Sequence, residues 1–191
     1  MGYKKGKVDV HISRICMVNG LDIDDMLKKA ERFLEINHEM SWNRSIYKSR
    51  NIEESLVNNV AEINESISYL ENLDCDDSDV EIEKKLKPLY DSRIMNDILS
   101  YTYMKVKDYP YEGNIYFNIL SKLYFEMYKI SCEDILESCS ISRPSYYRKR
   151  KEALVLFGVI LWSMAIPFLK ENINNSVNEF RNLLLEAGRM G

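Results

Sequence analysis

The spacing of apolar residues predicts α-helices along most of the chain. From residue 22 onward, apolar side chains recur every three or four positions, which places them on one face of a helix. The first such stripe follows aspartates that suit a helix N-terminus and consists of Ile23, Met26, Leu27, Ala30, Phe33, Leu34 and Met40. Before it, residues 8–15 alternate apolar and polar positions. We interpret them as an extended arm, because one short strand cannot form a sheet.

A second helix is predicted over residues 52–73. Its apolar residues are spaced by four and three in turn and comprise Leu56, Val60, Ile63, Ile67 and Leu70. The repeat spans only about two and a half heptads, whereas a coiled coil needs about three to four. Packing within one chain and dimerisation through this face are both open.

An acidic cluster separates this helix from the next ones. Residues 74–79 hold four aspartates, but they lack the central glycine and terminal glutamate of a calcium-binding loop, so we expect an exposed loop. A short helix then covers residues 80–87, and Pro88 is expected to open the following helix. The apolar face of that helix is predicted to contain Leu89, Ile94, Ile98, Leu99, Tyr101 and Met104.

The strongest break in the pattern lies at residues 108–113, where a proline and a glycine follow each other closely. We place a domain boundary there. Residues 1–107 form a helical N-terminal region that serves oligomerisation or partner binding, and residues 108–191 form a second domain. A chain of 191 residues with 46% apolar residues, 7 Gly and 4 Pro suits an all-α fold with this organisation.

Three helices are predicted after the break. The first covers residues 114–127, with an inward face made of Ile115, Ile119, Leu120, Leu123 and Met127. The second begins at Ser131, whose hydroxyl can cap it, and ends near Ser138. After a turn that contains Ile141 as an apolar plug, Ser142 caps the third helix, and Pro144 lies in its first turn, where no amide hydrogen is needed. This order predicts a helix-turn-helix.

Charge makes the third helix the main functional candidate. The whole chain carries a formal net charge of −4, yet residues 142–152 hold five cations and one acid. A locally reversed charge indicates an anionic partner, of which nucleic acid is the commonest. The alternative is an ordinary solvated helix face.

A helical wheel separates the side chains of this helix. Tyr146 and Ala153 point inward, Arg148 and Lys151 point outward, and Lys149 and Arg150 flank the core. Arginine suits guanine edges, and hydroxyl groups suit phosphate oxygens. The candidate DNA-contacting residues are Ser142, Arg143, Pro144, Ser145, Tyr147, Arg148, Lys149, Arg150 and Lys151.

Residues 134–153 resemble the helix-turn-helix of sigma-70 region 4-like proteins, and more narrowly the ArpU-type phage transcriptional regulators of Gram-positive hosts. The resemblance covers residues 115–157 and rests on Ile141, Ser142, Arg143, Ser145, Tyr147, Arg148 and Ala153. Ser140 stands where the family usually has glycine, and Pro144 replaces a small polar residue. The resemblance implies a sequence-specific transcriptional regulator of phage or mobile-element origin. It would read the major groove of double-stranded DNA with the helix that starts at Ser142.

A long apolar helix is predicted directly after the basic one. Residues 153–169 are seventeen positions without a charge, and a helix that is apolar all round is buried in a core or an interface. Packing against the N-terminal region and a homo-oligomer interface are both open. We do not expect a membrane span, because the run is short for one and Pro167 breaks it. A last helix is predicted over residues 175–187.

The remaining sequence offers no catalytic or metal motif. Four cysteines form no CxxC pair, the two histidines do not supply the ligand spacing of a structural zinc site, and no glycine-rich phosphate loop occurs. We therefore expect no enzyme, no metal and no cofactor. Without a recognisable secretory signal, we expect a cytoplasmic protein with reduced cysteines.

The acidic middle and the heptad-like stripe also support a second hypothesis for the function. This is a protein-interaction or assembly module without catalysis, such as a phage packaging subunit or an adaptor for RNA polymerase or a sigma factor.

Overall fold

The computed structural model describes residues 9–47, 60–92, 94–126, 128 and 130–173, and in this part of the chain all regular structure is helical. This confirms the all-α prediction. The α-helices are α1 (Val10–Val18), α2 (Ile23–Tyr47), α3 (Val60–Glu71), α4 (Asp79–Asp91), α5 (Ile94–Lys107), α6 (Gly113–Tyr124), α7 (Cys132–Cys139) and α8 (Arg143–Ile160), followed by a π-helical turn, η1 (Leu161–Ala165).

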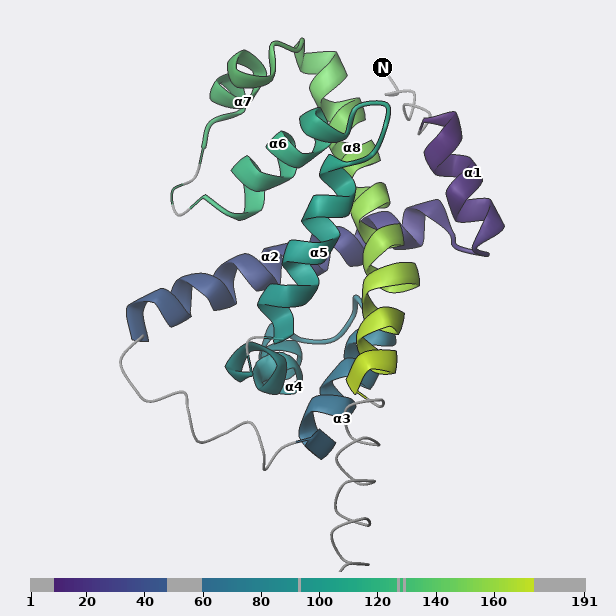
Figure 1. Ribbon diagram of the computed structural model, residues 1–191. Helices are drawn as coiled ribbons and strands as arrows, with labels where there is room; N and C mark the ends of the chain where they lie inside the picture. The colour runs from purple at the N-terminus through teal and green to yellow at the C-terminus, as the bar shows by residue number, and fades with distance from the viewer. Residues whose placement is uncertain (1–8, 48–59, 93, 127, 129, 174–191) are drawn as a thin grey trace, which may run out of the picture.

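Helix α8 is the central element of the fold. It packs against α1, α2, α5 and α6, and Figure 1 shows it running beside α5 and crossing α2. Every residue from Ala153 to Leu161 is buried. The first half of the apolar run therefore belongs to the core of a single chain, whereas Met164 and Phe168 further along are exposed.

One hydrophobic core contains residues from both sides of the expected boundary at residue 108. The aromatic rings of Phe33 on α2 and Tyr103 on α5 lie 6.3 and 5.3 Å from that of Phe157 on α8, measured between centroids. The predicted break is confirmed as the connection between α5 and α6, which pack against each other. The division of labour between residues 1–107 and 108–191 stays a prediction.

A smaller cluster joins α6, α7 and the start of α8. Ile119, Ile135 and Tyr146 are buried together, one from each helix, and Ile141 in the turn packs against them. The inward direction predicted for Tyr146 and Ala153 is confirmed, as is the plug role of Ile141.

The extended arm predicted over residues 8–15 is wrong, because this segment forms most of α1. Asp9 caps the helix, since its Oδ1 accepts hydrogen bonds from the backbone amides of His11 and Ile12 at 2.9 and 3.4 Å. Ile12 and Cys16, one helical turn apart, are both buried. A cap and one buried turn outweigh the short alternating pattern.

Pro88 is predicted to open a helix and Pro167 to break one, but both lie inside helices. Pro88 lies inside α4, close to its C-terminal end, and the next helix begins only at Ile94. Leu86 before it and Leu89 after it are both buried, so this end of α4 is packed against the core. The helix likewise continues through Pro167 to residue 173. The π-turn η1 just before Pro167 widens the backbone, which relieves the clash of a proline ring with the preceding turn.

The predicted apolar faces of α3 and α5 are confirmed in part. Ile63, Ile67 and Leu70 are buried within the chain, which accounts for that part of the stripe by intramolecular packing. On α5 the buried face includes Thr102 and Tyr103, whereas Met104, predicted to point inward, is 53% exposed. The predicted positions at Leu56, Met127 and 175–187 lie outside the described residues.

The helical stretch from Arg143 to Ile173 is long and apolar enough to cross a membrane, judged by length and composition alone. Two thirds (67%) of its most apolar stretch is buried inside the protein. The core helix of a globular protein meets the same criteria, so this stretch is weak evidence for a membrane span.

Candidate nucleic-acid interface

A short turn sets the direction in which α8 leaves α7. Ser131 caps α7 as predicted, since its Oγ accepts from the amide of Asp134 at 3.2 Å. At the other end, Ser140 adopts the left-handed conformation with φ 52° and ψ 44°. The amide of Ile141 then donates to the carbonyl of Leu136 at 3.0 Å, which closes the turn. Three residues therefore connect the two helices, and α8 begins at Arg143.

The start of α8 is set by its backbone more than by a side-chain cap. Ser142 is the N-cap residue, as predicted, with φ −77° and ψ 156°. Its hydroxyl makes no capping bond and instead donates to Ser145 Oγ at 3.1 Å. Pro144 occupies the first turn, where its fixed φ suits a helix and its missing amide hydrogen has no partner to lose.

The predicted DNA-contacting residues at the start of α8 point to the surface. Tyr147 is 56% exposed, and the side chains of Arg143 and Arg148 are 55% and 53% exposed. Ser142 and Pro144 are exposed, and Ser145 is half-buried. The rings of Tyr147 and the buried Tyr146 lie in an edge-to-face arrangement, with their centroids 5.3 Å apart.

Each cation of the basic run has an acidic partner within the protein. At the tip of α8, Arg143 pairs with Glu133 on α7, and Arg148 Nε lies 3.9 Å from Glu152 Oε1 one turn further along. The second pair is at the outer limit of an ion pair, which leaves the Arg148 guanidinium the most loosely held of the five cations.

The other three cations are turned toward the body of the protein. The Lys149 side chain is only 6% exposed and pairs with Glu112. Arg150 pairs with Glu31 on α2, and Lys151 Nζ lies 3.3 Å from Asp24 Oδ1 on the same helix. The outward direction predicted for Lys151 is therefore wrong, because its side chain faces α2. Lys149 and Arg150 also lie away from the exposed tip that carries Arg143, Tyr147 and Arg148.

The pair between Arg150 and Glu31 belongs to a network that fixes α8 to α2 and α6. Arg150 also donates to the hydroxyl of Tyr124 at 3.2 Å. Burial lowers the pKa of Arg150, but Tyr124 and Glu31 outweigh it and raise this pKa above its ordinary value. Burial raises the pKa of Tyr124 to about 12, with the charge of Arg150 acting in the opposite direction. Arg150 therefore stays charged and Tyr124 stays neutral near pH 7, and their hydrogen bond connects α8 to α6.

A buried carboxylate lies directly beneath the exposed tip. Glu152 is 4% exposed, and its Oε2 accepts from the hydroxyl of Tyr116 on α6 at 3.0 Å. Burial raises the pKa of Glu152 above its ordinary value, against the hydrogen bond from Tyr116 and the charges of Arg148 and Lys149, which lower it. Burial likewise raises the pKa of Tyr116. The effect of burial on the Glu152 pKa is thus larger than the opposing effect of its hydrogen-bond and charge partners.

No family model, curated protein or solved structure matches this chain. Only the residues of α8 and their neighbours in the fold therefore bear on what this helix does.

Sequence inspection missed the acidic partners of the basic run. Glu31 and Asp24 are 119 and 127 positions away from Arg150 and Lys151. No local pattern marks them, because they meet α8 only when α2 packs across it. Glu112 carried a weak signal, since it lies at the predicted break just before α6.

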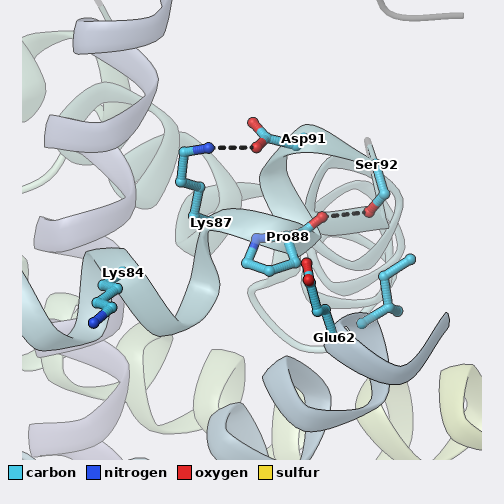
Figure 2. Close-up of a pocket in the computed structure, with 7 residues that line it drawn as sticks. Glu62, Lys84, Lys87, Pro88, Asp91 and Ser92 are labelled. Atoms are coloured by element: carbon cyan, nitrogen blue, oxygen red, sulfur yellow. Dashed lines mark hydrogen bonds and ion pairs between the residues drawn. The ribbon is translucent and has the colours of Figure 1, made fainter. Parts of the chain in front are cut away.

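A shallow hollow lies on the surface between α3 and α4. It is lined by charged residues of both signs together with uncharged ones: Glu62, Ile63, Lys84, Lys87, Pro88, Asp91 and Ser92. Figure 2 shows that Lys87 pairs with Asp91, at 3.0 Å, and that Ser92 Oγ donates to the carbonyl of Pro88 at 2.8 Å. These groups satisfy one another, so we assign no ligand to the hollow. The described residues contain no cluster of side chains suited to a metal ion.

Proposed function

We propose that this protein is a sequence-specific DNA-binding transcriptional regulator of phage or mobile-element origin. In this proposal α6, α7 and α8 act as a helix-turn-helix, and the N-terminal turns of α8 enter the major groove. The observation that carries it is the exposed tip of α8, where Arg143, Tyr147 and Arg148 project from a helix anchored in the core. A rigid helix holds such side chains in a fixed register, as base recognition requires.

The internal ion pairs change the expected character of this binding. Each phosphate contact made by a cation contributes about −0.9 to the slope of log affinity against log salt. Lys149, Arg150 and Lys151 are held by acids of the protein, so we expect their charges to contribute little. We therefore expect a slope from α8 well below that of five phosphate contacts, with the largest share from Arg148, whose acidic partner is 3.9 Å away.

Binding to DNA fragments from the region around the protein's own gene tests this proposal. Arg148→Ala is expected to lower the affinity for a preferred fragment about 5- to 150-fold, the range for losing one bidentate contact to a base. Lys151→Ala is the matched control, because it removes the same charge from the same helix on the side that faces α2. Absence of salt-sensitive binding by the wild type, or equal affinity of Arg148→Ala and the wild type, would contradict the proposal.

The pairing of all five cations also favours a second candidate function, a protein-interaction or assembly module. A cationic helix whose charges are neutralised within the fold has little net attraction for a polyanion. In this alternative the partner is RNA polymerase, a sigma factor, a packaging protein or a second copy of the chain. Capture of one defined protein from nuclease-treated host lysate, together with no DNA binding, would favour it; mass measurement in solution detects self-association.

A further inference from the structure

The ion pair between Arg143 and Glu133 joins the first turns of two successive helices. Glu133 lies in the first turn of α7, and Arg143 is the first residue of α8. Both side chains are more than half exposed, at 55% for Arg143 and 67% for Glu133. The pair thus lies on the surface, next to Pro144 and Tyr147 at the exposed tip.

The two charges are not equally suited to their positions. The positive end of a helix dipole stabilises an acid in the first turn and disfavours a cation there. Glu133 therefore stabilises α7, whereas Arg143 lies at the unfavourable end of α8. Glu133 compensates for this by supplying the negative charge that α8 lacks in its own first turn, where no acidic residue occurs.

We infer that Glu133 is a specificity-determining residue that competes with DNA for Arg143. This inference rests on the proposed DNA-binding function. The Glu133 carboxylate occupies one guanidinium nitrogen of Arg143 and offsets its positive charge, so it competes with a phosphate or a guanine edge for this side chain. Trading the Glu133 carboxylate for a phosphate, or for the neutral acceptors of a guanine edge, gains little free energy, so Arg143 adds little to binding at an arbitrary sequence. Only a site that also satisfies Tyr147 and Arg148 favours the exchange, and penalising wrong partners in this way is a common source of specificity.

Glu133→Gln provides the direct test, because it removes the charge and keeps the size of the side chain. Measured on a duplex of random sequence, its affinity is expected to exceed that of the wild type about two- to five-fold, the range for an exposed ion pair. Affinity for the preferred fragment is expected to rise less, so the ratio of the two affinities falls. Glu137→Gln is the matched control, because Glu137 is an exposed acid of the same helix and its loss changes the net charge equally.

A double substitution tests whether the rise in affinity depends on the ion pair between Arg143 and Glu133. In the Arg143→Ala background, Glu133→Gln is expected to leave the affinity for the random duplex unchanged. An equal rise in Glu133→Gln and Glu137→Gln, or a rise that persists without Arg143, would overturn the inference and leave the proposed function intact. If neither the wild type nor Glu133→Gln binds any duplex at low salt, the proposed function fails as well. Thermal unfolding of each variant separates these outcomes from loss of folding.

Discussion

The two halves of α8 are held in the protein by different forces. Residues 143–152 contain five cations, each paired with an acid from α2, α7, the loop before α6 or α8 itself. Residues 153–160 are all buried apolar residues or glycine, in contact with α2, α5 and α6. One continuous helix therefore passes from a charged, partly exposed segment into the centre of the core.

This difference indicates where stability comes from and where substitution is tolerated. An exposed ion pair contributes about 0–1 kcal/mol, whereas burying one large apolar side chain contributes about 1.5–3 kcal/mol. The apolar half is therefore expected to contribute more to the free energy of unfolding than the exposed ion pairs at the tip do. The exposed charged residues of the tip are therefore expected to change at small cost to stability.

The largest expected effect is that of Phe157→Ala in the apolar half. The Phe157 ring is fully buried against Phe33 and Tyr103, so its loss removes apolar contacts and leaves a cavity. We expect the free energy of unfolding to fall by about 3–5 kcal/mol, measured by urea denaturation. Tyr147→Ala in the charged half removes an aromatic ring from an exposed position and is expected to cost less than about 1 kcal/mol. Equal losses would refute the contrast between the halves.

A graded pair of substitutions at Gly158 probes the contact between α8 and α2. A Cβ atom there would lie 3.0 Å from the carbonyl oxygen of Met26 and 3.3 Å from the Cβ of Ala30. Gly158→Ala gains about 1 kcal/mol of helix propensity, which offsets much of this crowding. Gly158→Val adds two further carbons and is expected to destabilise by about 1–3 kcal/mol in the same assay. Equal stability of the two variants would mean that α2 moves aside freely.

The comparison also explains which features the sequence predicted. The stripe on α2, the cap at Ser131 and the inward side of Tyr146 follow from local spacing, because a helix fixes the directions of its own side chains. Local spacing also identified residues 153–169 as apolar all round. The charge partners of Lys149 and Arg150 depend on how distant helices pack, and no local rule contains that information. The basic run therefore looked like a free cationic surface in the sequence and is internally neutralised in the fold.

The buried Glu152, between the two halves, is expected to make the free energy of unfolding depend on pH. Burial raises its pKa above the ordinary value of 4.5, so the folded state binds this proton more tightly than the unfolded state does. The contribution to stability is full below pH 4.5 and is lost as the pH rises through the raised pKa. Relative to Glu152→Gln, which stays neutral, the wild type is expected to lose stability over this window.

Urea denaturation of both proteins from pH 4 to pH 8 measures this difference. Tyr116→Phe serves as the companion variant, because it removes the hydrogen bond that opposes the effect of burial on the Glu152 pKa. Its stability is expected to fall more steeply with pH than that of the wild type. A difference between wild type and Glu152→Gln that does not change with pH would show that Glu152 ionises as readily in the fold as in the unfolded chain.

The smallest expected change in stability comes from the turn between α7 and α8, just before the charged half. Ser140 is the one non-glycine residue of the described chain with a positive φ, at 52°. Glycine adopts this conformation without strain, so Ser140→Gly is expected to stabilise the protein by up to about 1 kcal/mol. Ser138→Gly, two residues earlier and inside α7, should instead destabilise by a similar amount, because glycine lowers helix propensity. Opposite signs for these two neighbours in thermal unfolding would show that the left-handed backbone at Ser140 costs stability in the wild type. If both variants lose stability, the Ser140 side chain itself holds the turn.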